Sequence, residues 1–206
     1  RADDTLLSRA AWIDGMGIAV KSATIFPGNP DAGKPRINGG VSLFSDTDGS
    51  LEAAVDFHLV TKWKTAGDSL FAATKLARPD SETILIVGAG TVGRSLFEAY
   101  SAAFPRARFR VWNRTRANAE AMADDCPGLR VTDDLERAVK DADIITSATM
   151  STEPLLKGAW LRPGQHVDLI GAFRPDMSEA DDEALKRARI FVDSHDTTKG
   201  HIGEIR

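Results

Sequence analysis

A glycine-rich turn between an apolar strand and a helix lies near the middle of this chain. Thr83-Ile-Leu-Ile-Val suits a buried parallel strand, and Gly88-Ala-Gly-Thr-Val-Gly follows it directly. The spacing G-x-G-x-x-G is weak evidence alone, but a strand before it and a helix over residues 92–103 supply the context of a dinucleotide-binding βαβ unit. The pattern therefore predicts a Rossmann-type domain, and a glycine turn without a ligand is the alternative.

The glycines of this turn each have a physical reason. Gly88 permits the tight turn, Gly90 lets the backbone approach a pyrophosphate, and Gly93 lets helix and strand pack closely. Exposed N–H groups at the start of the helix, where Thr91 and Val92 lie, attract phosphate together with the helix dipole. We predict that these five residues bind a nicotinamide dinucleotide.

The end of the second strand of this unit distinguishes the two coenzymes. NAD sites usually place Asp or Glu about 20 residues on, where it binds the ribose 2′-hydroxyl. Here that position is Asn113, followed by Arg114, Thr115 and Arg116. A neutral amide does not repel a 2′-phosphate, and the basic residues offer charge-assisted donors. We favour NADP(H), with NAD(H) possible, and a solvated basic loop is the alternative.

Small residues follow another strand at the carboxyl edge of the expected sheet. Ser147 is the last residue of the strand expected over 143–147, and Ala148 and Thr149 come directly after it. Ligands of such folds bind at this edge, so the three residues leave room for the nicotinamide ribose. A plain exit from strand to loop is the alternative.

The hydrophobic pattern divides the chain into two parts. Strands and helices alternate after residue 80, which is typical of a doubly wound parallel sheet, whereas residues 1–79 are β-rich with one long helix over 59–77 that Pro79 ends. We therefore expect an α/β protein with domains 1–79 and 80–206. The expected strands are 18–26, 37–44 with an interruption at glycines 39 and 40, 51–58, 83–87, 108–112, 129–131, 143–147, 165–170 and 190–192, and the other helices are 92–103, 116–125, 135–140 and 178–188.

Charge and cysteine content exclude several classes of protein. The net charge of −4 is spread over both signs, so nucleic acid and membrane surfaces are not expected as partners. No apolar run approaches the ~18 residues of a spanning helix. The single Cys126 forms no internal disulfide, and the spacing around His195 and His201 fits no metal site. We expect a cytoplasmic protein without a metal.

Several segments together resemble the ornithine cyclodeaminase/mu-crystallin family. They are Lys21 through Pro30, Lys64-Thr-Ala, Val87-Gly-Ala-Gly, Asn113-Arg-Thr, Ala148-Thr-Met-Ser-Thr-Glu-Pro and Gly171-Ala-Phe-Arg-Pro-Asp-Met. The resemblance covers nearly the whole chain in the expected order. It implies a split β-rich domain for substrate binding and dimerisation, a Rossmann domain, and a homodimer. It also implies a fragment that lacks both ends of the family chain.

The resemblance assigns roles to three residues of the first part. Lys21 would contact the substrate, either at its carboxylate or at the reacting nitrogen, and a lowered pKa would let it deliver a proton. Lys64 stands where many relatives have a carboxylate-binding arginine, which keeps the charge but loses the two parallel bonds. Thr65 would contact the coenzyme phosphates. Ordinary solvated lysines are the alternative.

Phe173 is the most informative departure from the family pattern. Cyclodeaminases are expected to have a catalytic aspartate there, and phenylalanine exchanges no protons. The resemblance is therefore to the ketimine reductase branch. It implies NADPH-dependent reduction of a small cyclic or linear α-imino acid, such as Δ1-pyrroline-2-carboxylate, to the amino acid. The alternatives are an ornithine cyclodeaminase that recycles NAD while it forms proline and ammonia, and a non-catalytic NADP-dependent ligand-binding protein.

Overall fold

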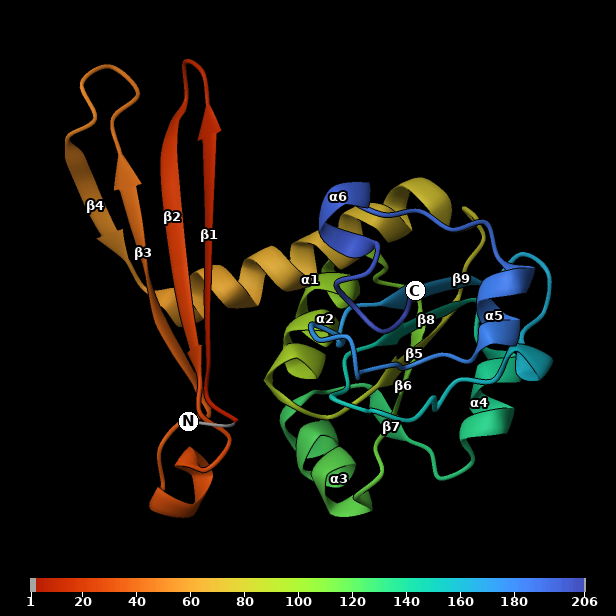
Figure 1. Ribbon diagram of the computed structural model, residues 1–206. Helices are drawn as coiled ribbons and strands as arrows, with labels where there is room; N and C mark the ends of the chain where they lie inside the picture. Colours follow the sequence, from red (N-terminus) through yellow and green to blue (C-terminus); the bar gives the residue numbers. More distant parts are fainter. Residues whose placement is uncertain (1–2, 206) are drawn as a thin grey trace. The chain divides into compact units, whose positions relative to one another are not determined.

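Two compact units make up the chain, which is described over residues 3–205 in a computed structural model (Figure 1). The division falls within the long helix α1 (Phe57–Leu76), between Lys64 and Thr65. The division into functional domains 1–79 and 80–206 stays a prediction.

The first unit is an antiparallel sheet with its strands in chain order. They are β1 (Thr5–Ile13), β2 (Gly17–Ile25), β3 (Ile37–Phe44) and β4 (Leu51–Val55), with a short 3-10 helix, η1 (Asn29–Ala32), between β2 and β3. β3 continues through Gly39 and Gly40, so the expected interruption is wrong. A Cβ at Gly39 would lie 2.5 Å from the ring of Phe57, so the missing side chain makes room for that ring.

Two features of this unit differ from the expected elements: the strand β1 and the end of β4. β1 is absent from the expected elements, and it forms by pairing with β2 along its whole length. The strand expected over 51–58 ends at Val55, because the carboxylate of Asp56 accepts the N–H of Leu59 at 2.8 Å and starts α1.

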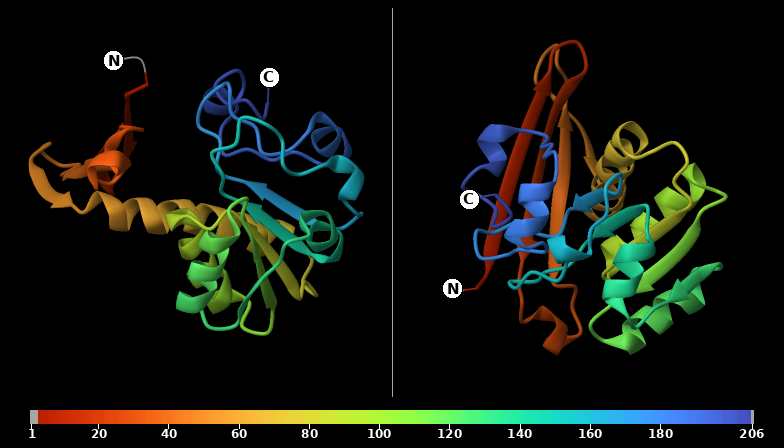
Figure 2. Two further views of the ribbon diagram at one scale, coloured as in Figure 1. Left: turned by 90° about the horizontal axis from the view of Figure 1, so that it is seen from below. Right: turned by 90° about the vertical axis from the view of Figure 1, so that its right-hand side faces the viewer.

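The second unit is a parallel sheet in the order β7-β6-β5-β8-β9. This doubly wound order has its switch point between β5 and β8. The strands are β5 (Thr83–Val87), β6 (Arg108–Trp112), β7 (Leu129–Val131), β8 (Ile144–Ser147) and β9 (His166–Leu169), and the helices are α2 (Thr91–Ala103), α3 (Arg116–Asp125), α4 (Leu135–Asp141), η2 (Gly158–Trp160), α5 (Asp182–Arg187) and α6 (His195–Thr198). Helices α2 and α3 cover one face of the sheet, and α4 and α5 cover the other (Figures 1 and 2).

Two expectations in the last part of the chain are wrong. The helix expected over 178–188 spans only Asp182–Arg187, because the Asp181 carboxylate caps it by accepting the N–H of Ala184 at 2.9 Å. Residues 190–192 form no strand. Ile190 and Phe191 are about half exposed, and the described part of the sheet ends at β9.

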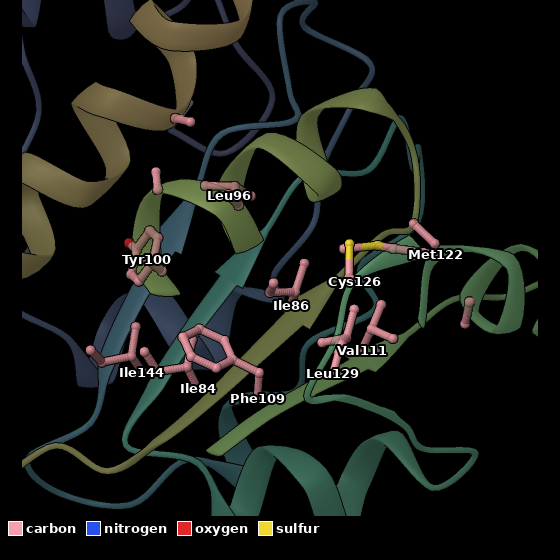
Figure 3. Packing of buried hydrophobic residues seen from close by; sticks show 14 of the residues in the cluster. Ile84, Ile86, Leu96, Tyr100, Phe109, Val111, Met122, Cys126, Leu129 and Ile144 are labelled. Atoms are coloured by element: carbon pink, nitrogen blue, oxygen red, sulfur yellow. The ribbon is translucent and has the colours of Figure 1, made fainter. Parts of the chain in front are cut away.

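Apolar side chains fill the space between the sheet and helices α1, α2 and α3 (Figure 3). Ile84 and Ile86 of β5 lie at its centre with Leu96 and Tyr100 of α2, all fully buried. Phe97 meets Phe109 edge to face, with ring centroids 5.2 Å apart. This core fixes the direction of α2 and therefore the position of the turn before it.

A polar cluster is buried within the second unit beside this core. Ser69 of α1 donates to Asp168 of β9 and lies 2.9 Å from the Tyr100 hydroxyl, and Thr146 donates to Asp168 at 3.2 Å. Burial raises the pKa of Asp168, and this effect outweighs the two hydroxyl donors. Burial raises the pKa of Tyr100 as well, and the nearby Asp168 adds to that rise.

Replacing Asp168 by Asn removes a carboxyl group whose pKa is raised in the folded chain. The folded protein keeps this proton at pH values where the unfolded chain has lost it, so the stability contribution is present at low pH and is lost as the pH rises through the folded-state pKa. Relative to the wild type, Asp168→Asn should therefore gain free energy of unfolding as the pH rises above the ordinary aspartate pKa, about 4, because only the wild type carries the group whose pKa is raised. Urea unfolding at several pH values measures this, and a difference that does not change with pH contradicts it.

The contact between α2 and the end of β5 has no room for a side chain. A Cβ at Gly93 would lie 2.1 Å from the carbonyl oxygen of Gly88, whereas a Cβ at Gly90 would meet nothing within 4 Å. We expect Gly93→Ala to lower the free energy of unfolding by about 1–3 kcal/mol through overpacking. Gly90→Ala is the matched control and should change it by less than about 1 kcal/mol. Equal melting temperatures for both variants would show that the contact does not constrain this turn.

Candidate functional site

The glycine turn after β5 lies where the neighbouring strands end. Gly88 has a φ of +108°, and a Cβ there would lie 2.8 Å from the carbonyl oxygen of Ala148, after β8. On the other side, its N–H donates to the carbonyl of Trp112, the last residue of β6, at 2.9 Å. The turn is therefore held between the ends of β6 and β8, at the switch point of the sheet.

The start of α2 is open to a ligand. Gly90 is exposed and precedes the helix in an extended conformation, and no side chain of residues 3–205 caps this end of the helix. Thr91 is exposed and Val92 is half-buried. Uncapped N–H groups, the helix dipole and a backbone that a ligand can approach closely suit a pyrophosphate. The residues present therefore fit the phosphates of a dinucleotide.

The Asn113 side chain holds the glycine turn. Its Oδ1 accepts the N–H of Ala89 at 3.1 Å, and its Nδ2 donates to the carbonyl of Thr115 at 2.9 Å. The amide thus joins the first turn of the βαβ unit to the loop after β6. A second role toward the ribose of a coenzyme stays a prediction for both Asn113 and Thr115.

The two arginines of the loop after β6 differ in their surroundings. Arg116 donates to Glu120 at 2.7 Å and to Asp133, so its charge is matched by two carboxylates. Arg114 is exposed, and within residues 3–205 its guanidinium forms no ion pair. Of the two arginines, Arg114 is therefore better placed to meet an anion.

A buried carboxylate that the sequence does not suggest lies beneath the ends of β8 and β9. Oε1 of Glu179 accepts the Ser147 hydroxyl, the Thr149 N–H and the Thr149 hydroxyl, each at 2.6 Å. Its Oε2 accepts the N–H of Gly171 at 2.7 Å. The only sequence signal is an acidic residue at the start of a predicted helix, a position that usually indicates a solvated helix end. Ser147 and Thr149 therefore point their hydroxyls at this carboxylate, and their contact with a coenzyme stays a prediction.

A second buried carboxylate supports the backbone of this segment. Glu204 accepts the N–H of Glu179 and the Ser178 hydroxyl, the latter at 3.2 Å. Burial raises the pKa of Glu204, although the backbone N–H donors act in the opposite direction. The segment 178–180 is thus held in place from two sides.

Lys21 lies in the middle of the sheet of the first unit. On β2 it stands between Arg9 of β1 and Val41 of β3, and it is half-buried. Its Nζ lies 5.2 Å from the centre of the Phe57 ring, at the start of α1. An ammonium group over an aromatic face beside apolar side chains is partly desolvated, which strengthens its attraction for an anion.

Lys64 follows Phe57 by about two helical turns, so the two residues share one side of α1. It is exposed. Thr61 lies between them on this side, and its hydroxyl oxygen is buried without a hydrogen-bond partner among residues 3–205. Thr65, the first residue of the second unit, is half-buried. The predicted roles of Lys64 and Thr65 are not decided by these positions and stay predictions.

The segment that carries Phe173 contains no carboxyl group free to replace the missing aspartate. Asp176 accepts two hydrogen bonds from Arg174, both at 3.0 Å, and the pair is exposed. The Arg174 guanidinium lies 5.8 Å from the centre of the Phe173 ring. Asp176 is thus already paired, which disfavours its use as a substitute acid or base.

The described residues contain no helix that is both long enough and apolar enough to cross a membrane. Within the same range, no group of three His, Cys, Asp or Glu side chains has an arrangement suited to a metal ion.

Comparison with known proteins gives matches along most of the chain. The family model described as ornithine cyclodeaminase/mu-crystallin family matches residues 12–206. The chain is 50% identical over 98% of its length to a Δ1-pyrroline-2-carboxylate reductase of Paracoccus denitrificans, and 38% identical over 91% to the ketimine reductase mu-crystallin of Rattus norvegicus. It spans 65% of the Paracoccus protein and 60% of the rat protein.

A solved structure has a similar fold. An archaeal alanine dehydrogenase dimer with bound NAD superposes with a TM-score of 0.84 at 26% identity, over 98% of this chain and 67% of that one. The fold expected from the sequence is thereby confirmed, and the comparisons confirm the family resemblance that the quoted segments indicate. The chain belongs to the ornithine cyclodeaminase/mu-crystallin family.

Proposed function

We propose that this chain is the coenzyme- and substrate-binding part of an NADPH-dependent reductase of small α-imino acids of the Δ1-pyrroline-2-carboxylate kind. The observation that carries the proposal is the 50% identity, over 98% of the chain, to a protein named for this reaction. The 38% identity to a ketimine reductase supports the same reaction class, since both names describe reduction of a C=N bond.

The residues of the second unit suit a nicotinamide coenzyme, which when bound supplies the hydride for the C=N carbon. Gly90, Thr91 and Val92 would face its pyrophosphate, because the helix start is open and uncapped by side chains. Gly88 and Gly93 give the turn its shape, and Ala148 lies against Gly88.

The lysines of the first unit suit the substrate. An α-imino acid carries a carboxylate beside the C=N bond, and the Lys21 ammonium over the Phe57 ring offers a partly desolvated positive charge. In our proposal Lys21 holds that carboxylate or donates a proton to the nitrogen, and Lys64 adds a second positive charge. Electrostatic neutralisation and orientation then contribute most to the rate.

Phe173 favours reduction over deamination. Loss of ammonia requires a group that exchanges protons at the α-nitrogen, which a phenyl ring does not do. Asp176, the nearest carboxylate in the sequence, is paired with Arg174. A reductase needs no such group at this position, because ammonia is not released.

The choice of NADP(H) rests on the loop after β6. Asn113 is neutral where NAD sites usually have a carboxylate, and its Oδ1 is bonded to the glycine turn. Arg114 is exposed beside it and forms no ion pair within the described residues. An arginine with these properties suits a 2′-phosphate.

The assembly and the compartment are part of the proposal. The sheet β1–β4 exposes large apolar side chains, which favours association with a second copy, and the archaeal neighbour is a dimer. These residues are Leu6, Trp12 and Ile13 of β1, Met16 in the turn after it, and Leu51 of β4. We propose a homodimer in the cytoplasm, where the buried thiol of Cys126 stays reduced.

The test of the reaction is a panel of cyclic imino acids and diamino acids, each assayed with NADPH and with NAD+. We expect imino acids to consume NADPH, which is seen as loss of absorbance at the nicotinamide band. Ammonia release from ornithine with NAD+ and no net change in coenzyme would identify a cyclodeaminase instead. Coenzyme binding without turnover of any compound would identify a ligand-binding protein.

Lys21→Ala should lower kcat/KM for the imino acid by about 10²-fold or more, because it removes the charge and the proton donor. Coenzyme affinity should stay unchanged. Lys62→Ala is the matched control, since Lys62 also lies over an aromatic ring, that of Trp63, at 4.5 Å. Equal rates for Lys21→Ala and the wild type would remove Lys21 from the reaction.

Arg114→Gln should weaken NADPH binding by about tenfold or more, because a charge-assisted hydrogen bond to the 2′-phosphate is lost. NADH binding should not change, since NADH lacks that phosphate. Arg116→Gln serves as the control, with a smaller effect expected because two carboxylates already pair with Arg116. Titration of coenzyme fluorescence gives both affinities, and a parallel loss for NADPH and NADH would contradict the role of Arg114.

A further inference from the structure

The Glu179 carboxylate joins two loops that are far apart in the sequence. It accepts from Ser147, the last residue of β8, from Thr149 in the loop after β8, and from Gly171, which follows β9. Four donors converge on one carboxylate, three on Oε1 and one on Oε2. Glu179 is fully buried, so it acts on anything outside the protein only through these loops.

Close packing around Gly171 leaves these loops little freedom. A Cβ at Gly171 would lie 2.0 Å from the carbonyl oxygen of Thr149 and 2.8 Å from Cδ of Glu179. The two loops therefore touch through their backbones directly above the carboxylate. A small displacement of the Glu179 carboxylate therefore shifts both loops together, because no side chain separates their backbones.

The position of these loops in the sheet assigns them to one half of the coenzyme. In doubly wound folds the adenosine ribose is bound after the second strand of the unit, which here is β6, and the ligand crosses the switch point. Beyond the switch point lie β8 and β9. The loops that Glu179 holds are thus those that would face the nicotinamide half of the coenzyme.

We propose that Glu179 is a positioning residue for the nicotinamide half of the coenzyme site. Its carboxylate fixes the loops after β8 and β9, and this inference rests on the proposed coenzyme function. Glutamine at this position has the same shape but carries an NH2 group, which faces an N–H or O–H donor in either orientation. At least one of the four donors then loses its acceptor, and the loop that carries it moves.

The experiment compares two ligands in the Glu179→Gln variant. NADPH contains both halves of the coenzyme, whereas adenosine 2′,5′-bisphosphate contains only the adenosine half. We expect the variant to bind NADPH about tenfold more weakly and to bind the bisphosphate with an affinity within about twofold of the wild type. Calorimetric titration measures both, and Glu153→Gln, at an exposed position in the loop after β8, is the matched control.

The outcomes separate this inference from the proposed function. A wild-type chain that binds neither ligand overturns the coenzyme function itself. If the wild type binds both, an equal loss for the two ligands, or no loss, refutes the positioning role and leaves the function standing. A role in folding alone would lower the melting temperature without changing the ratio of the two affinities.

Ser147→Ala provides a milder test if Glu179→Gln does not fold. It removes one of the four donors and leaves the carboxylate in place. A selective loss of NADPH affinity relative to the bisphosphate supports the proposal, and unchanged or equally reduced affinities overturn it.

Discussion

The approach of Gly93 in α2 to the carbonyl of Gly88 is the contact on which the candidate coenzyme site depends. With no side chain between them, α2 begins one tight turn after β5, and no side chain among residues 3–205 caps its first N–H groups. The same closeness brings Ala148 against the turn from β8, and Asn113 bonds to it from the loop after β6. Three segments of the second unit therefore meet at one point because two glycines lack side chains.

Local signals were enough to predict part of the second unit. β6, α3 and β7 begin and end at the predicted residues, since each is a short run with clear turn residues on both sides. Elements that depend on distant partners were not predictable in this way. β1 forms through its pairing with β2, and α5 starts late because Asp181 caps it and Glu204 holds the segment before it. No local pattern contains that information.

In the candidate site, too, only the features that depend on local sequence could be predicted. The glycine motif and Asn113 lie close together, as expected for two parts of one βαβ unit, but the hydrogen bond that joins them was not predicted. The role of Glu179 could not be predicted from the sequence, because its donors come from residues 147, 149 and 171, which meet only in the folded chain. Likewise, the sequence does not distinguish Arg114 from Arg116. Only the structure shows that Glu120 and Asp133 already pair with Arg116.

Buried carboxylates order the loops at this edge of the sheet, where the apolar core does not reach. Loops that bind a polar ligand must expose backbone N–H groups, so apolar packing from outside is not available to order them. Glu179 orders them from beneath by accepting backbone and hydroxyl donors, each of which would be costly to bury unpaired. Asp168 is the second-last residue of β9, and within residues 3–205 its hydrogen-bond donors are all hydroxyl groups. Its raised pKa indicates that these donors do not offset its burial. Glu179 accepts two backbone N–H groups as well as two hydroxyls, so it holds the backbone of both loops directly, as a binding edge requires.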